Sequence, residues 1–317
     1  MNIIRFIKNW TLPLSMLLGV VLYFVYVNIP FLAPTKPFVE QSLAIIQPLL
    51  IFAMLFLSFC KVDIKDLKLC KWHVWLLLIQ GGTFTLLAII LIVFPHFSER
   101  ILLEGAMICL ICPTATAAAV VTQKLKGNAA HLITYTVLVN LLTAVLVPLI
   151  VPIIHPQEGI DFLTAFVMIL GKVFPLLLCP FIAAVLIRHL LPKTHAFLIK
   201  FKDLPFYIWA VALILAISVT VKAIVHSEYS VWLEIGLAVA SLITCAFQFY
   251  VGRKIGTHYG DSVTAGQSIG QKNTVLAIWM GYTFFTPITS IVGGFYSVWH
   301  NTYNSYQLYA ERKKSEV

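Results

Sequence analysis

The sequence has few charged residues. Only 11% of its 317 residues are Asp, Glu, Lys or Arg, whereas 60% are hydrophobic, and the mean hydropathy is +0.92. Soluble domains contain about 25% charged residues, which cover their water-facing surface. The shortage of charge excludes a soluble enzyme, a nucleic-acid-binding domain and a secreted disulfide scaffold. It indicates an all-α polytopic membrane protein.

The sequence also lacks several marks of catalysis and metal binding. It contains no HExxH zinc motif and no P-loop. Cys109 and Cys112 have the spacing of a metal-binding pair, but no histidine or second pair lies near them in sequence. All six cysteines fall in apolar segments or beside basic loops, which predicts reduced thiols. We expect no enzyme, no cofactor and no metal site.

Ten apolar segments are each long enough, or nearly so, to cross a bilayer as a helix. The whole chain, 1–317, is predicted to be a single membrane domain. The expected spans are Thr11–Val27, Phe38–Phe59, Trp72–Phe94, Ile101–Val121, Ala129–Ile154, Phe162–Ile187, Pro205–Val221, Val231–Val251, Ser262–Thr283 and Phe285–Trp299.

Basic residues are unevenly distributed between the two sides of these spans. If the N-terminus is cytoplasmic, most of the 22 Lys and Arg residues lie in inside segments. This bias follows the positive-inside rule and predicts that both termini are cytoplasmic. The net charge of +9 therefore requires no nucleic acid or other acidic partner. The exceptions on the outside are Lys36, Arg100 and Lys222, and Lys172 and Lys272 lie within spans.

Two predicted spans are interrupted near their centres. In the fourth, Pro113 removes a backbone donor and is followed by Thr114 and Thr116. In the ninth, Gly270 precedes the polar run 271–274. A proline kink and a polar packing seam would explain the breaks singly. Their matching positions in two five-span halves favour inverted repeats, with helices 4 and 9 crossing at a mid-membrane binding site.

The segment Cys112–Asn128 resembles the Pro-Gly-Gly-Thr-Ala-Ser-Asn segment of the bile acid:sodium symporter family. Ser268–Ala277 resembles that family's Glu-Val-Gly-Met-Gln-Asn-Ser-Gly-Leu-Ala, and the resemblance extends over essentially the whole chain. It implies a bacterial inner-membrane (plasma-membrane) carrier of an organic anion, bile-acid-like or a small carboxylate. It also implies a core of spans 3–5 (72–154) and 8–10 (231–299), and a panel of spans 1–2 (11–59) and 6–7 (162–221).

The family's sodium ligands are largely absent when they are transferred by this resemblance. The family's Ser-Asn pair falls on Ala118 and Ala119, whose methyl groups cannot ligate a hard cation. The family's glutamate falls on Ser268 and its glutamine on Lys272. We therefore expect weak or absent sodium coupling. The resemblance leaves as candidate ion-binding or coupling residues Lys272, Gln80, Ser268, Gln271 and Thr136, and as substrate-binding residues Thr114, Thr116, Asn273, Thr274 and Lys172.

Lys272 lies about ten residues from either end of its predicted span, or ~15 Å along a helix, too deep for its ammonium to reach water easily. We expect it to replace a sodium ion, holding the crossing helices together and favouring an anionic substrate. The alternative is that Lys272 caps the carbonyl end of the half-helix Ser262–Gly270.

The remaining intramembrane charges are Lys172 and three glutamates. Lys172 is expected to be a second buried cation that faces the core, either binding a carboxylate or pairing with Glu104. Glu40, Glu104 and Glu234 are expected near the outer span ends, where water reaches them.

Three functions remain open from the sequence. The first is the organic-anion carrier with weak sodium coupling. The others are a non-transporting receptor or scaffold that keeps the fold, and a conventional sodium:organic anion symporter.

Overall fold

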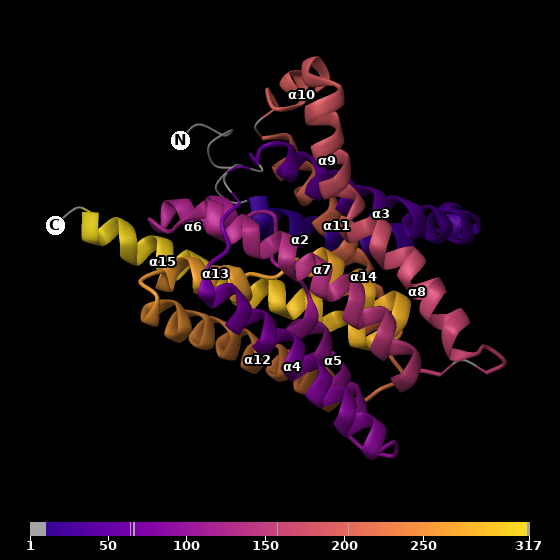
Figure 1. Ribbon diagram of the computed structural model, residues 1–317. Coiled ribbons are helices and arrows are strands. Elements are labelled where there is room, and N and C mark those ends of the chain that lie inside the picture. Colours follow the sequence, from indigo (N-terminus) through magenta and orange to yellow (C-terminus); the bar gives the residue numbers. More distant parts are fainter. Residues whose placement is uncertain (1–10, 64, 66, 157, 202, 316–317) are drawn as a thin grey trace.

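The computed structural model describes residues 11–63, 65, 67–156, 158–201 and 203–315 (Figure 1). Within these residues the secondary structure is helical, and the one β-type contact is an isolated bridge. The prediction of an all-α protein is confirmed.

Most helices follow the predicted apolar segments, but the last one runs to Ser315, well beyond the predicted end at Trp299. In chain order they are α2 (Thr11–Asn28), the 3-10 helix η1 (Pro30–Thr35), α3 (Lys36–Cys60), α4 (Lys71–Val93), α5 (Arg100–Ile111), α6 (Ala118–Lys124), α7 (Ala129–Ile154), α8 (Phe162–Leu177), α9 (Cys179–Leu190), α10 (Pro192–Leu198), α11 (Leu204–Val225), α12 (Val231–His258), α13 (Ser262–Gly270), α14 (Thr274–Phe284), the 3-10 helix η3 (Ile288–Ser290) and α15 (Ile291–Ser315).

Short polar side chains define where several of these helices begin. Asn128 Oδ1 accepts hydrogen bonds from the backbone N–H groups of the first turn of α7, and Asp161 does the same for α8. Ser230 caps α12 and Asn273 caps α14. Each cap satisfies a backbone donor that has no partner within its helix.

Three predicted spans consist of two helices each. The fourth is α5 and α6, the sixth is α8 and α9, and the ninth is α13 and α14. The axes of α8 and α9 differ by 43°, and the break at Leu178 lies between Pro175 and Pro180. A proline disrupts the hydrogen bonding and packing of the preceding turn, which accounts for the bend. The segment Pro192–Asp203, between the sixth and seventh predicted spans, contains the short helix α10.

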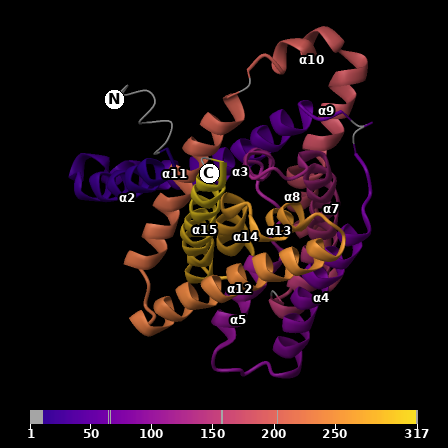
Figure 2. The ribbon, with the colours of Figure 1, turned by 90° about the vertical axis from the view of Figure 1, so that its left-hand side faces the viewer.

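The helices pack in two neighbouring groups (Figure 2). In one, α11 lies against α2 and α3, and α3 against α9. In the other, α12 packs against α5, α13 and α15, and α4 packs against α5 and α7. Helix α8 contacts α7 and α3, and α14 contacts α11 and α15, so the two groups share a continuous apolar core.

Five of the described helices are long and apolar enough to cross a membrane. They are the continuous η1–α3 unit, α4, α7, α11 and α12, and the bent pair α8–α9 makes a sixth. Large apolar side chains such as Leu78, Leu163 and Trp232 are more than half exposed. Such an apolar surface is typical of helices that face lipid.

Candidate functional site

The breaks in α5–α6 and α13–α14 are hydrogen-bonded to each other. The backbone N–H of Ala115 donates to the Gln271 carbonyl at 2.8 Å, and that of Asn273 donates to the Pro113 carbonyl at 2.9 Å. These two bonds form an antiparallel bridge between Thr114 and Lys272. The prediction that the two breaks meet is confirmed, and we call this contact the crossing.

Local sequence explains why the chain unwinds here. Pro113 disfavours a helical backbone at the preceding residue, and Cys112 is extended, with φ −54° and ψ 132°. Helix α5 therefore ends at Ile111. In the second strand of the bridge, Gln271 is also extended, and the Asn273 side chain starts α14 by accepting from the Leu276 N–H at 3.2 Å.

Side chains from other helices bind the carbonyls at the end of α5. The Lys272 ammonium donates to the Leu110 carbonyl at 3.2 Å. The Gln80 amide donates to the Ile111 and Cys112 carbonyls, both at 3.1 Å. Carbonyls left unpaired by a helix break are costly to bury, so these donors stabilise the break.

Three further side chains complete this arrangement. Thr143 donates to the Ile111 carbonyl at 2.9 Å, and Gln248 donates to the Cys109 carbonyl at 3.2 Å. The Tyr135 hydroxyl donates to Gln80 Oε1 at 2.9 Å and so orients its amide. The carbonyl oxygens at the end of α5 thus face nitrogen and hydroxyl donors.

The carbonyl end of α13 is bound by hydroxyl groups. Thr114 Oγ1 donates to the Ser268 carbonyl at 2.5 Å, and the Tyr296 hydroxyl donates to the Gly270 carbonyl at 2.8 Å. The hydrogen bond of Lys272 goes to α5. The alternative in which Lys272 caps Ser262–Gly270 is therefore wrong, because the extended bridge directs its side chain toward the other half-helix.

Lys272 is a buried cation without a carboxylate beside it. It is 1% exposed, and no described Asp or Glu lies within 4.0 Å of its ammonium. The ionisable groups that interact with it are the thiols of Cys109, Cys112 and Cys245. A positive charge balanced only by carbonyl and thiol dipoles attracts an anion.

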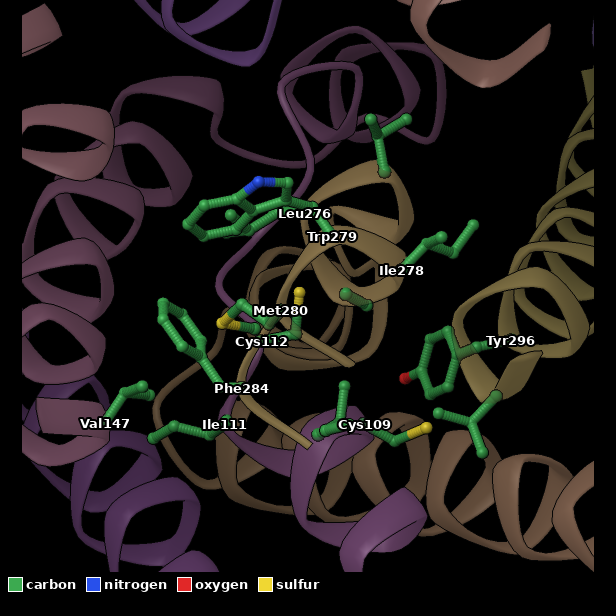
Figure 3. Packing of buried hydrophobic residues seen from close by; sticks show 14 of the residues in the cluster. Cys109, Ile111, Cys112, Val147, Leu276, Ile278, Trp279, Met280, Phe284 and Tyr296 are labelled. Carbon is green, nitrogen blue, oxygen red and sulfur yellow. The ribbon is translucent and has the colours of Figure 1, made fainter. Parts of the chain in front are cut away.

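The surroundings of the crossing are apolar. Figure 3 shows Cys109, Ile111 and Cys112 of the α5 break near side chains of α14 and Tyr296 of α15. The α14 side chains in this view include Trp279, Met280 and Phe284. A low local dielectric strengthens every electrostatic contact made there.

Several candidate site residues lie at the crossing with an unused polar atom. Ser268 Oγ, Gln271 Oε1 and Asn273 Nδ2 are buried and have no hydrogen-bond partner among the described residues. Thr274, at the start of α14, is also buried, whereas Thr116 is half-buried. Unpaired buried polar atoms are costly, so these three atoms are candidates to bind a ligand.

Thr136 and Lys172 are not part of the described crossing. The hydroxyl of Thr136 donates to the Leu132 carbonyl one turn earlier in α7, at 2.9 Å. Lys172 is exposed on α8, so the expectation of a second buried cation is wrong. The next residue of α8, Val173, is buried in the core, whereas Lys172 lies on the adjoining exposed side of the helix.

The expectation that water reaches Glu104 is also wrong. Glu104 is 1% exposed, and its Oε1 contacts Arg100 Nε at 2.7 Å and His155 Nε2 at 3.0 Å. Arg100 also donates to the Ile154 carbonyl at the end of α7. The partners of Glu104 are thus these two residues and not Lys172. They join the start of α5 to the end of α7.

Helix α15 carries a stripe of buried polar residues that the sequence analysis did not predict. Ser297, His300, Asn304 and Gln307 recur at intervals of three and four, and each is at most 7% exposed. Asn304 Oδ1 accepts from Gln267 of α13 at 2.9 Å and from Gln307 at 3.2 Å. The spacing is visible in the sequence, but the predicted last span ended at Trp299, before most of the stripe.

One short string has the spacing of a hydrolase motif. Gly266–Gly270 reads Gly-x-Ser-x-Gly, which in hydrolases places a nucleophilic serine at a strand-to-helix turn. Here it forms the buried helix α13, and Ser268 Oγ has no described hydrogen-bond partner that could act as a base. The string does not form a nucleophile site.

Two cavities are lined by residues outside the two breaks. One, of about 590 Å³, is a groove between α12 and α15. The other, of about 510 Å³, is bordered by the start of α4, the α6–α7 loop and the α12–α13 loop. In the second, His131 Nδ1 lies 2.9 Å from Asp261 Oδ2.

Comparison with known proteins identifies relatives of the chain. A family model described as the Sodium Bile acid symporter family matches residues 48–228, a range that includes the α5 break. The uncharacterized sodium-dependent transporter YocS of Bacillus subtilis (strain 168) is 24% identical over 247 residues. That alignment covers 75% of this chain and 73% of YocS. Both matches agree with the resemblance found in the sequence.

Proposed function

The chain belongs to the sodium bile acid symporter family, and we propose that it is a secondary active transporter that moves an organic anion by alternating access. It is an integral membrane protein of a transporter family. The observation that supports the proposed mechanism is the hydrogen-bonded crossing. Unwound backbone within a membrane is tolerated where it is buried in protein or lines a cavity, and it is typical of substrate sites in secondary transporters.

The proposed topology has ten spans in two inverted five-helix repeats. The matched positions of the α5–α6 and α13–α14 breaks support it, as does the uneven distribution of basic residues. Both termini are then cytoplasmic, in a bacterial inner membrane. In this proposal α4–α7 and α12–α15 form the core, and α2, α3, α8, α9 and α11 form the panel that moves against it.

Lys272 is proposed to replace a transported sodium ion. A sodium site needs several oxygen ligands directed at one point. At the crossing, the Leu110 carbonyl accepts from the Lys272 ammonium, and the Ile111 and Cys112 carbonyls accept from Gln80. Oxygens that accept from nitrogen donors are poorly available to a cation. Sodium coupling is therefore weak or absent, and the ammonium supplies a fixed positive charge.

The substrate is proposed to be a carboxylate, either bile-acid-like or smaller. The positive charge of Lys272 favours an anion, and the Asn273 amide has a donor without a partner in the described chain. Thr114, Thr116 and Thr274 supply hydroxyl groups on the same two breaks.

A conventional sodium:organic anion symporter is the second candidate. The family description and the name of the Bacillus subtilis relative both refer to sodium. Ser268 Oγ and Gln271 Oε1 are buried oxygens without described partners, and they could contribute to a rebuilt cation site. In this candidate Lys272 would have to leave the crossing when sodium binds.

Counterflow in proteoliposomes tests the proposed function. Vesicles containing the full chain would be loaded with an unlabelled carboxylate and diluted into buffer that contains the same compound in labelled form. The carboxylates tested would range from bile acids to short-chain acids. Saturable accumulation of label in sodium-free buffer supports the carrier. Binding of a carboxylate without counterflow would indicate a receptor, and counterflow only with sodium would indicate the conventional symporter.

A further inference from the structure

The groove between α12 and α15 has a long apolar wall. Its volume is about 590 Å³, and it follows α12 from Leu242 to Arg253, a distance of ~17 Å at 1.5 Å per residue. Leu242, Ala246 and Phe249 line one side. Trp299 and Tyr303 of α15 line the other. The dimensions suit a single hydrocarbon chain lying parallel to the helices.

Two cations lie together at one end of this groove. The Arg253 guanidinium carbon is 5.9 Å from the centre of the Tyr303 ring, and the Lys254 ammonium is 5.7 Å from that of Tyr250. Arg253 also donates to Gln307 Oε1. Neither cation has a carboxylate within 4.0 Å in the part of the chain that the structure describes. Ring contacts hold both side chains in place while their positive charge stays unpaired.

The direction of the helices places this basic end at the C-terminal side. Trp299 contacts the Ala238 carbonyl and Arg253 contacts Gln307, so α12 and α15 run parallel. Figure 1 shows α15 beside α12, with the C-terminus beyond the end of α15. Both basic residues therefore lie toward Arg312–Lys314, on the side where the charge distribution places the cytoplasm.

We propose that this groove binds an anionic phospholipid from the cytoplasmic leaflet. One acyl chain lies along the apolar wall, and the headgroup phosphate lies between Arg253 and Lys254. Basic residues between helices on the cytoplasmic side bind anionic headgroups, and long basic side chains can keep their stems on an apolar surface. The unpaired charge selects an anionic headgroup, while the apolar wall selects a lipid over a free phosphate.

Native mass spectrometry of the full chain tests this assignment. The protein would be titrated with phosphatidylglycerol and with phosphatidylcholine of identical acyl chains. We expect tighter retention of phosphatidylglycerol, weakened about 30-fold in the double variant Arg253→Gln/Lys254→Gln. The control Lys313→Gln/Lys314→Gln removes the same charge from the end of α15 and should change retention less than threefold. Ala246→Trp fills the groove without altering charge and should also weaken binding.

Three results would overturn the proposal. Equal retention of both lipids would show that no headgroup is selected, and an equal loss in the control would show a general effect of charge. Displacement of lipid by inorganic phosphate at equal concentration would indicate a phosphate site without an acyl chain. If the double variant fails to fold, as judged by circular dichroism, Ala246→Trp decides the outcome. None of these readouts depends on transport, so they do not test the proposed function.

Discussion

The Lys272 ammonium donates a hydrogen bond to the Leu110 carbonyl at 3.2 Å, although the two residues are 162 positions apart in sequence. This contact joins the second broken helix to the end of the first. It places an unpaired positive charge where the backbones of both helices are unwound. The energetically costly charge of Lys272 thus lies at the point where the two breaks meet. This position has consequences for stability and for transport that can be measured.

Replacing the buried ammonium should stabilise the protein while abolishing transport. Lys272→Met removes a charge that has no acid beside it and keeps most of the side-chain volume. The desolvation cost that is avoided should exceed the contribution of the lost hydrogen bond to Leu110. We therefore expect the free energy of unfolding to rise by about 1–3 kcal/mol. Apparent unfolding temperature in detergent and counterflow would be measured together. A lower unfolding temperature would show that Lys272 is mainly a structural cap of α5.

Sodium should have little effect on uptake by the native chain. Replacing sodium with potassium at constant ionic strength should change initial uptake rates by less than about twofold, because the Leu110, Ile111 and Cys112 carbonyls accept from nitrogen donors and are poorly available to a cation. A cation that did bind the folded protein would also raise its unfolding temperature by mass action. Initial uptake rates and thermal unfolding with each salt provide the measurement. Strong saturable stimulation by sodium would contradict this view of the crossing.

Restoring the family's ligands should create sodium dependence. The combined variant Ala118→Ser, Ala119→Asn, Ser268→Glu and Lys272→Gln adds oxygen ligands and removes the ammonium. We expect sodium to raise its unfolding temperature. Lys272→Gln alone is the control, because it removes the charge without supplying the missing carboxylate. If the combined variant folds but sodium leaves its stability unchanged, the correspondence of these positions with the family's sodium sites is wrong.

The contact between α12 and α13 should depend on glycine. A Cβ at Gly252 would lie 2.6 Å from Ile269 Cγ2 and 2.7 Å from the Ala265 carbonyl. Gly252→Ala should therefore force the helices apart and lower the free energy of unfolding by about 1–3 kcal/mol. At Gly82 on α4 a Cβ would contact nothing within 4 Å, so Gly82→Ala should be neutral or stabilise by up to ~1 kcal/mol. Equal unfolding temperatures for the two variants would refute the argument.

Glu104 should stabilise the outer junction of α5 and α7. Glu104→Ala removes the acceptor for Arg100 and the carboxylate beside His155, and it leaves a partly buried guanidinium with one partner fewer. We expect a loss of about 1–3 kcal/mol, since Arg100 remains partly exposed. Glu99→Ala, at an exposed neighbouring position, should change stability by less than ~0.5 kcal/mol. A similar loss in both variants would show that the effect is not specific to the pairing.

The amino-acid sequence did not predict the bend at Leu178 or the short helix α10. By itself it determined the helical fold, the positions of most helices and the two breaks that form the crossing. These are local properties. Long apolar runs form helices in a membrane because every backbone polar group must be satisfied internally. Pro113 ends α5 and Asn273 starts α14 through the backbone geometry of adjacent residues. The family resemblance depends on the same short segments.

The tertiary structure alone decided which side chains pair across the fold. Sequence reasoning left open whether Lys272 joins the crossing helices or caps the end of α13, and the structure shows it bound to Leu110 of α5. It also left Glu104 with water or Lys172, whereas its partners are Arg100 and His155. Partners separated by tens to hundreds of positions depend on which faces of the helices meet and on how far each helix is rotated about its axis. An apolar membrane sequence specifies those faces weakly, because residues that face lipid and residues that face protein are equally hydrophobic.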